Sequence, residues 1–167
     1  EYRGSFSQFV GSESVIAGNL VKKITRNFPS FIDEWQYNNQ KIPFLKRAQL
    51  LVADISSTIR GLKIEGTEKL TACADYKLPY LLRNEGILVY SNDLSATVDT
   101  GIEIPPGHPT EIEIRSATIQ SVDLITTKLQ EALPNMRAMD VNDYLWIASQ
   151  DRKPQDNLYH HTRTTAY

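Results

Sequence analysis

One segment of the chain is apolar on nearly every side of the helix it would form, and it restricts the fold more than any other feature. Residues 44–59 follow Pro43, which suits the first turn of a helix, and precede Gly61, a common residue after a helix end. Its apolar residues are Phe44, Leu45, Ala48, Leu50, Leu51, Val52, Ala53, Ile55 and Ile59. A helix of this kind is normally buried in the middle of a domain. The segment therefore predicts a central helix against which the rest of the chain packs.

The same segment carries Lys46, Arg47 and Asp54, and a charge on a buried helix needs a partner or a ligand. Arg47 and Asp54 are two turns apart on one helix face. Two interpretations of Asp54 stay open. It either forms a buried ion pair with Arg47 or Lys46, or it contacts a ligand with its carboxylate.

The remaining periodicity predicts a mainly α-helical domain over residues 1–167, with about six helices and at most a short β-hairpin. In the first half of the chain, further helices are expected from Ser12 or Ser14 to about Phe28, over Gly66–Tyr76, and over Tyr80–Asn84 after Pro79. In the second half, we expect a short helical turn capped by Asn92 or Asp93, and a long helix from a capping box at Thr110–Glu113 to Leu133. A last helix is expected from a cap at Asp140 through Ile147. Asn38-Asn39 within residues 31–42 indicates a hairpin or an irregular turn, and residues 102–107 indicate a loop.

Composition excludes several classes of protein. Eighteen lysines and arginines against 20 aspartates and glutamates give a net charge of -2, which argues against a nucleic-acid binder that works mainly by phosphate neutralisation. Cys73 is the only cysteine, which excludes an intrachain disulfide and a cysteine zinc site and fits a cytoplasmic protein. No apolar run reaches the ~18 residues that span a bilayer, so no membrane partner is expected.

Common short motifs of catalysis are absent from the sequence: it has no glycine-rich phosphate loop, no nucleophile elbow and no histidine pair at zinc-helix spacing. His160 and His161 are neighbours that would point apart, which favours a solvated tail over a metal site. We therefore expect no metal and no cofactor. Glu111 and Arg115, four residues apart on a helix, are more typical of a surface pair.

Asp75 lies within Ala72-Cys73-Ala74-Asp75-Tyr76-Lys77-Leu78-Pro79, just before a proline. Spacing alone favours a cap for the helix that starts near Pro79. The alternative is a carboxylate held at a helix junction and facing a pocket, with the aromatic ring of Tyr76 beside it. The residues by themselves leave both interpretations open.

Several ordered segments resemble the queuosine salvage proteins, the queuosine 5'-phosphate N-glycosylases. They are residues 46–54 (Lys-Arg-Ala-Gln-Leu-Leu-Val-Ala-Asp), 70–71 with 74–79, 86–88 with 90–91, 111–115, and 143–146 followed by 161–163. Gly4-Ser5-Phe6 is also similar to a family segment. The resemblance covers essentially the whole chain, and it implies a fold like that of helix-hairpin-helix DNA glycosylases.

The sequence also departs from the family pattern. Ile55-Ser56-Ser57 replaces a usual tryptophan, Cys73 an aromatic residue, and Ile147 an acidic one. The family carries a long N-terminal half, and the chain opens with Glu1 rather than methionine, so we expect it to be the C-terminal half of a longer architecture. These departures remove aromatic surface that would stack on a base.

The resemblance implies hydrolysis of the N-glycosidic bond of queuosine 5'-monophosphate, which releases queuine. Such cleavage passes through an oxocarbenium-like sugar that a carboxylate stabilises or attacks. Asp75 is our first choice for this carboxylate, and Asp54 is the second. Phe6 and Tyr76 are candidates for stacking on the base. The candidates for binding the phosphate or other polar groups are Lys46, Arg47, Lys77, Arg115, His161 and Arg163.

Two alternatives to this enzyme remain. The first alternative is a non-catalytic remnant that keeps the fold and binds the base. The second is a tRNA-binding module. The acidic balance disfavours the second, so no stable nucleic-acid partner is expected. Release of queuine on mixing with the nucleotide separates the enzyme from both.

Overall fold

The computed structural model describes residues 4–11, 15–59, 61–151 and 156–167. Their α-helices are α1 (Phe6–Val10), α2 (Ala17–Asn27), α3 (Lys46–Thr58), α4 (Lys77–Asn84), α5 (Asn92–Asp99), α6 (Pro109–Leu129) and α7 (Ala138–Ala148). Two short 3-10 helices are η1 (Pro29–Phe31) and η2 (Thr67–Lys69). The mainly helical class is confirmed, with seven α-helices among the described residues where about six were expected. The likeness to helix-hairpin-helix DNA glycosylases stays a prediction.

The strands are short and form two separate pairs. β2 (Glu34–Tyr37) and β3 (Gln40–Pro43) are antiparallel, whereas β1 (Val15–Ile16) lies parallel to β4 (Ile64–Glu65). Asn38 and Asn39 connect β2 to β3 with φ angles of 47° and 61°. Two consecutive residues of positive φ are typical of the tight turn that asparagine tolerates, so the predicted hairpin is confirmed. The pairing of β1 with β4 was not expected.

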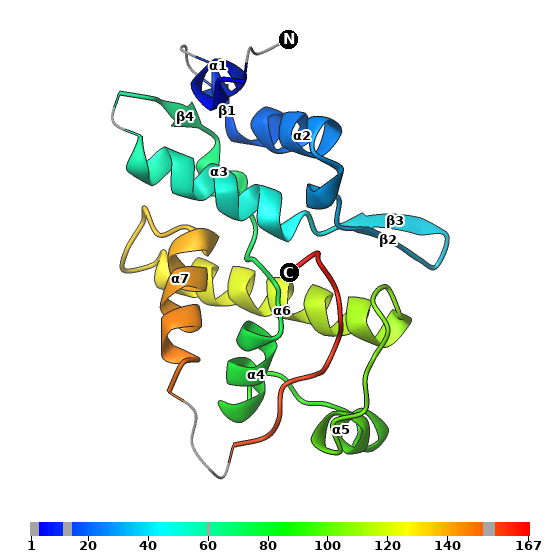
Figure 1. The fold of residues 1–167 in the computed structure, drawn as a ribbon. Helices are drawn as coiled ribbons and strands as arrows, with labels where there is room; N and C mark the ends of the chain where they lie inside the picture. The colour runs from blue at the N-terminus through cyan, green and yellow to red at the C-terminus, as the bar shows by residue number, and fades with distance from the viewer. Residues whose placement is uncertain (1–3, 12–14, 60, 152–155) are drawn as a thin grey trace.

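Figure 1 shows how the helices are arranged. α1, α2 and α3 lie on one side of the long helix α6, and α4, α5 and α7 lie against or below it. Residues 156–167 run back across α6 and end near the start of α3 (Figure 1). Within the part of the chain that the structure describes, no helix is long and apolar enough to cross a membrane.

Two apolar clusters hold these layers together. In the first, Leu20 and Ile24 of α2 pack against Ala48 and Val52 of α3, and all four are at most 1% exposed. The second cluster joins α4, α6 and α7 through Leu78, Leu82, Val122 and Val141. Burial of such side chains contributes roughly 1.5–3 kcal/mol each. The first cluster also contains Met139 of α7, so the first turn of α7 packs against the layer formed by α2 and α3.

α3 is buried along one face only, so the prediction of a helix buried all round is wrong. Ala48, Gln49, Val52 and Ile55 are buried, whereas Asp54 is exposed. The apolar residues of the opposite side are partly covered by the first cluster and partly face the cavity. The exposed Asp54 therefore does not need a buried partner.

Two helix starts differ from prediction because strands precede them. α2 begins at Ala17, since Val15–Ile16 pair with β4, and Ser12 and Ser14 lie outside the described residues. α3 begins at Lys46, since Pro43 completes β3. Pro43 therefore ends a strand where we expected it to open a helix.

The predicted helix over Gly66–Tyr76 is wrong. Only η2 is helical there, because side chains from other helices bind the backbone of the rest. The amide oxygen of Gln49 accepts a hydrogen bond from the Thr71 backbone N–H at 2.9 Å, and Asn142 Oδ1 accepts one from the Cys73 N–H at 2.8 Å. Backbone groups engaged in this way are not available to a helix.

The caps of α5 and α6 also differ from prediction. Ser91, rather than Asn92 or Asp93, caps α5 through a hydrogen bond from the Leu94 N–H. His108 caps α6, and its Nδ1 accepts from the Thr110 N–H, so Thr110 lies within the helix instead of capping it. In both cases the true cap lies a residue or two before the predicted one.

The end of α6 and the start of α7 also differ from the predicted boundaries. α6 ends at Leu129 rather than Leu133. α7 begins at Ala138, and Asp140 lies in its first turn, where its carboxylate accepts from the Arg137 N–H at 2.9 Å. Asp140 therefore stabilises the start of α7 from inside the helix.

The β2–β3 hairpin packs against the start of α6. The hydroxyl of Tyr37 donates to Glu113 Oε1 at 2.6 Å. Gly107, just before α6, has a φ of 75° and lies so close to the ring of Trp35 that a Cβ atom would collide with it. Only glycine combines this conformation with this contact.

Candidate active site

A cavity of about 390 Å³ lies between α3 and α7. It is lined by Lys46, Leu50, Asp54, Cys73, Asp75, Asn142, Asp143, Trp146 and Ile147. Among the described residues, this lining carries three carboxylates, from Asp54, Asp75 and Asp143, and one ammonium group, from Lys46. The cavity thus brings together both predicted catalytic carboxylates and one of the predicted substrate-binding residues, Lys46.

Asp75 is 4% exposed and uses its two oxygens differently. Oδ1 accepts hydrogen bonds from the backbone N–H groups of Lys77 at 2.8 Å and Leu78 at 3.3 Å. Oδ2 lies 3.7 Å from Lys46 Nζ. The two interpretations of Asp75 are therefore compatible in one side chain, which caps α4 and also lines the cavity.

Lys46 is the first residue of α3, and its side chain is 15% exposed. An ion pair at this depth is screened less than one at the surface, so Lys46 and Asp75 hold each other more firmly than an exposed pair would. The pair lies on the inner wall of the cavity because both residues are largely covered. A ligand that reaches this wall would meet the carboxylate and the ammonium together.

Asp54 is exposed and lies on the cavity wall, with no ion pair among the described residues. Arg47 points elsewhere: its Nη1 donates to the carbonyl oxygens of Ser30 and Thr165, at 3.1 and 3.0 Å. Its guanidinium also lies over the ring of Phe31. The buried Arg47–Asp54 pair that helix spacing allowed does not form.

Arg115 is fully buried, so the prediction of a surface pair with Glu111 is wrong. Both side chains are 0% exposed, and their closest N–O distance is 3.4 Å. The principal partner of Arg115 is Asp33, whose carboxylate accepts from Nη1 at 2.8 Å and Nη2 at 2.6 Å. Arg115 does not line the cavity that contains Asp75.

The other predicted substrate-binding residues lie away from this cavity. Phe6 is in α1, on the opposite side of α2 and α3 from α7 (Figure 1). Tyr76 and Lys77 are at the start of α4, where the ring centroids of Tyr76 and Tyr159 are 5.0 Å apart. His161 lines a separate hollow of about 290 Å³, and Arg163 is exposed. Their assignment to substrate binding stays a prediction.

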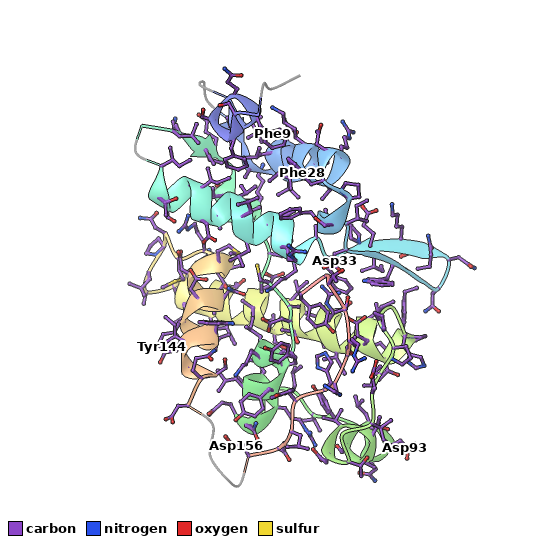
Figure 2. The ribbon with its side chains drawn as sticks, in the orientation of Figure 1. Phe9, Phe28, Asp33, Asp93, Tyr144 and Asp156 are labelled. Atoms are coloured by element: carbon purple, nitrogen blue, oxygen red, sulfur yellow. The ribbon has the colours of Figure 1, made fainter. Side chains whose placement is uncertain are left out.

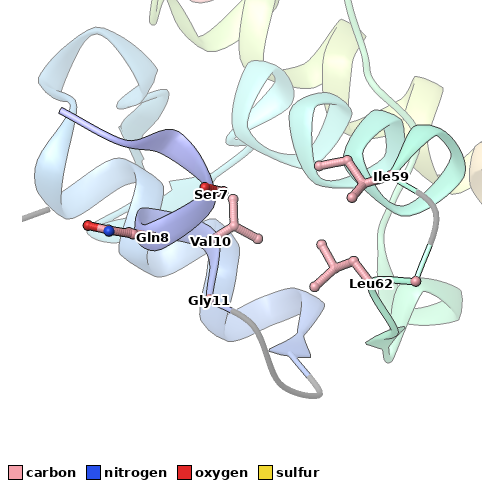
Figure 3. Close-up of a pocket in the computed structure, with 7 residues that line it drawn as sticks. Ser7, Gln8, Val10, Gly11, Ile59 and Leu62 are labelled. Atoms are coloured by element: carbon pink, nitrogen blue, oxygen red, sulfur yellow. The ribbon is translucent and has the colours of Figure 1, made fainter. Parts of the chain in front are cut away.

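A larger hollow of about 510 Å³ lies between α1 and the segment after α3 (Figure 3). The described residues that line it are Ser7, Gln8, Val10, Gly11, Ile59, Gly61 and Leu62. None of these has an ionisable side chain, so they offer no group for acid–base catalysis. Within the described chain, no three side chains of His, Cys, Asp or Glu are placed to hold a metal ion. The α3–α7 cavity is therefore the better candidate.

The sequence was compared with known families and proteins. The family described as "Queuosine salvage protein" matches residues 1–167. This chain belongs to the queuosine salvage protein family. The resemblance inferred from the ordered motifs is thereby confirmed.

Members of the queuosine salvage family with assigned names match nearly the whole chain. It is 38% identical over 170 residues to the queuosine 5'-phosphate N-glycosylase/hydrolase of Sphaerobacter thermophilus, covering 99% of this chain and 52% of that protein. The protein of the same name from Bos taurus is 34% identical over 181 residues, covering 100% and 53%. That of Schizosaccharomyces pombe is 29% identical over 148 residues, covering 87% and 42%. The chain thus spans about half the length of the curated relatives it matches.

Four cavity residues from α7 were not predicted as site residues: Asn142, Asp143, Trp146 and Ile147. A signal existed for Asp143 and Trp146, because residues 143–146 form one of the queuosine salvage motifs. Sequence alone did not show which face of α7 meets the cavity. Asn142 explains the placement, since its Oδ1 accepts from the Cys73 N–H and its Nδ2 donates to Asp143 Oδ1 at 3.1 Å.

Two of the departures from the pattern expected of the queuosine salvage family line the cavity, at Cys73 and Ile147. Burial raises the pKa of the Cys73 thiol to about 12, opposed by Lys46 and reinforced by Asp75. The thiol is therefore protonated at neutral pH and is a poor nucleophile. The ionisable groups left for chemistry in this cavity are the carboxylates and Lys46.

Proposed function

We propose that this chain carries the catalytic site of an N-glycosidase that hydrolyses queuosine 5'-monophosphate and releases queuine. The observation that carries the proposal is the placement of Asp75, with one oxygen fixed by two backbone N–H groups and the other lining a cavity beside Lys46. Relatives that bear the name of this activity match essentially the whole chain.

The geometry of Asp75 suits the charge that develops when the bond between the sugar and the base breaks. In the transition state the sugar gains positive charge, and a carboxylate already held in place stabilises it without reorganising. Oδ1 is fixed by the first turn of α4, so Oδ2 is the oxygen available to the sugar. Asp75 acts on the anomeric carbon either electrostatically or as a nucleophile.

The rest of the reaction needs a proton for the base and a water molecule for the sugar. The C1'–N bond breaks, the departing nitrogen gains a proton, and the oxygen of water bonds to C1'. Among the described residues that line the cavity, Lys46 alone carries an ammonium group, and it is the candidate donor to the base or to a ligand oxygen. Asp143 and Asp54 line the same cavity, and a carboxylate there can accept the proton from water.

The planar base is assigned to Trp146, which lines the cavity and remains 46% exposed. An indole ring that stays open to solvent offers a face for stacking, worth ~1–3 kcal/mol per base. This assignment replaces Phe6 and Tyr76, neither of which lines the cavity.

The single buried cysteine, Cys73, fits a reducing compartment such as the cytoplasm.

The proposal is tested by incubating the purified chain with queuosine 5'-monophosphate and detecting queuine by mass spectrometry. The expected result is time-dependent release that Asp75→Asn abolishes or greatly slows. Ile16→Ala, which changes an exposed residue outside the cavity, serves as the control and should release queuine normally. If the wild-type chain is folded and releases none, it is not by itself the hydrolase.

One observation favours a second candidate, a protein that binds the base without cleaving it. Cys73 and Ile147 occupy the cavity wall at positions where the family pattern has an aromatic and an acidic residue. Calorimetric titration with queuine and the release assay together separate the candidates, because a remnant would bind queuine and yet leave the nucleotide intact. A tRNA-binding role is disfavoured, since three carboxylates of this cavity face one lysine and would repel a phosphate backbone.

A further inference from the structure

Asp33 joins the start of α3 to α6. Its carboxylate accepts from Arg115 through both oxygens, and Oδ2 also accepts from the backbone N–H of Lys46 at 3.2 Å. Oδ1 accepts from Trp35 Nε1 at 3.0 Å. Asp33 is 1% exposed and lies beside the start of α3 (Figure 2). It therefore caps the helix whose first residue is Lys46.

The backbone of Asp33 reinforces this cap. Its carbonyl oxygen accepts from the N–H groups of Phe44 at 3.0 Å and Leu45 at 3.1 Å. Leu45 consequently takes a left-handed conformation with φ of 49°, which a leucine rarely adopts without surrounding support. Three successive N–H groups thus point to one residue. The position from which Lys46 enters the cavity depends on Asp33.

Arg115 connects this cap to the segment that carries Asp75. Its Nε donates to the carbonyl oxygen of Ala74 at 3.1 Å, while its two terminal nitrogens bind Asp33. The guanidinium lies between the rings of Phe44, 3.9 Å from the centroid, and Tyr167, 4.6 Å from the centroid. One planar group therefore holds two separate pieces of chain in register.

Residues 156–167 complete the surroundings of Arg115. The hydroxyl of Tyr167 donates to Glu111 Oε1 at 3.1 Å, and Gly107 N–H donates to Glu111 Oε2 at 3.2 Å. We call Asp33, Glu111, Arg115 and Tyr167 the Arg115 cluster. Its carboxylates are satisfied by donors on several sides, which an ion pair out of water requires.

We infer that Arg115 is a positioning residue for the Lys46–Asp75 pair. It lies out of contact with the cavity, yet it binds both the cap of Lys46 and the residue before Asp75. The inference rests on the proposed function, since it concerns the geometry of that catalytic carboxylate. It also replaces the earlier expectation that Arg115 contacts the substrate.

The functional importance of this support follows from the sensitivity of catalysis to position. A displacement of about 1 Å at a reacting group lowers the rate by roughly 10²-fold. Lys46 and Asp75 come from a helix start and an irregular segment, and neither element fixes their separation alone. Reacting side chains keep a productive geometry only when the residues packed behind them fix their positions.

Arg115→Lys tests the inference. Lysine keeps the positive charge beside Asp33 but cannot also bond to Ala74 O, because one ammonium group does not reproduce the fork of a guanidinium. We expect kcat for queuine release per folded molecule to fall by roughly 10²-fold. KM should stay within about threefold, because no contact with the substrate is removed.

Arg83→Lys is the matched control. Arg83 also forms a two-bond ion pair, with Asp99 at 2.7 Å for both bonds, and lies 4.7 Å from the ring centroid of Tyr90. It does not line the cavity. Its replacement costs the same kind of interaction without moving Lys46 or Asp75, so kcat should match the wild type. Equal losses of kcat in both variants would reduce the role of Arg115 to general stability.

If Arg115→Lys does not fold, Tyr167→Phe decides. It removes one hydroxyl from the Arg115 cluster and keeps the ring over the guanidinium, so kcat should fall severalfold at constant KM. If the variant that folds, Arg115→Lys or Tyr167→Phe, has a wild-type kcat, the inference is overturned. It is also overturned if the substitution changes KM and leaves kcat unchanged. Failure of the proposed function looks different, because the wild-type chain itself would then release no queuine.

Discussion

Lys46 Nζ lies 3.7 Å from Asp75 Oδ2, while the other oxygen of Asp75 receives two backbone N–H groups from the first turn of α4. A single carboxylate is thus shared between a helix cap and a cavity wall. The cap needs only an oxygen acceptor, whereas stabilisation of a cationic sugar needs the negative charge. Substitutions that separate these two properties can therefore separate stability from catalysis.

Asp75→Asn should lower queuine release by about 10²–10³-fold, because the neutral amide does not stabilise an oxocarbenium ion. The amide oxygen can still accept from Lys77 and Leu78. The variant should therefore melt at a higher temperature than Asp75→Ala, which also loses the cap at a cost of ~1 kcal/mol. Melting curves and mass spectrometry on both variants check this. Near-normal release from Asp75→Asn would leave Asp75 as a cap alone and transfer the catalytic assignment to Asp54.

Asp54 and Asp33 should differ sharply in their effect on stability. Asp54 is exposed and outside any described ion pair, so Asp54→Ala should change the free energy of unfolding by no more than about 0.5 kcal/mol. Asp33→Ala leaves the buried guanidinium of Arg115 without its main partner and should cost about 3–5 kcal/mol. Urea unfolding measures both. Similar costs for the two variants would contradict the burial difference.

Trp146→Ala should weaken binding of queuine by about 1–3 kcal/mol, since it removes the aromatic face of the cavity. Tyr144→Ala is the control: Tyr144 lies on the same helix, is 73% exposed and points away from α3 (Figure 2). Isothermal titration calorimetry compares the two dissociation constants. Equal affinities for both variants would show that the base does not stack on Trp146.

Stability should fall as the pH is lowered from about 6.5 to about 4, because of His160. Burial, together with the charges of Arg115 and the neighbouring His161, lowers the pKa of His160 from 6.5 to about 4. Between these values the unfolded chain binds a proton that the folded chain does not. The free energy of unfolding therefore decreases on acidification, by up to about 1.4 kcal/mol per pH unit.

His160→Gln removes this titration and should flatten that part of the pH profile, as measured by urea unfolding at a series of pH values. His161→Gln changes the exposed neighbour and should keep the wild-type slope. A wild-type slope in His160→Gln would show that other groups cause the acid sensitivity. Both variants test stability only and do not depend on the proposed function.

The features that the sequence predicted correctly depend on residues close together in the chain. The apolar periodicity of residues 44–59 predicts a helix whichever neighbours it has, and Asn38-Asn39 predicts a tight turn through its own backbone preferences. Asp75, four residues before Pro79, was predicted to cap the helix that starts there, and its carboxylate does accept from the first N–H groups of α4, which begins earlier, at Lys77. Family membership was equally accessible, because it depends on ordered motifs.

The features that the sequence did not predict depend on contacts between distant segments. The Cys73 segment is not helical because Gln49 and Asn142 bind the backbone around it, and Arg115 is buried because Asp33, 82 residues away, pairs with it. Packing between distant segments also decided which residues of α7 line the cavity.

The sequence by itself therefore determined the helical class, the hairpin and the family. Tertiary structure alone decided that Lys46 and Asp75 meet, that Asp54 stays exposed and that Arg115 is buried against Asp33 and Ala74. The physical reason is the range of the interactions. Capping and periodicity act over one or two helical turns, whereas the desolvation and pairing of charges depend on which distant surfaces are packed together.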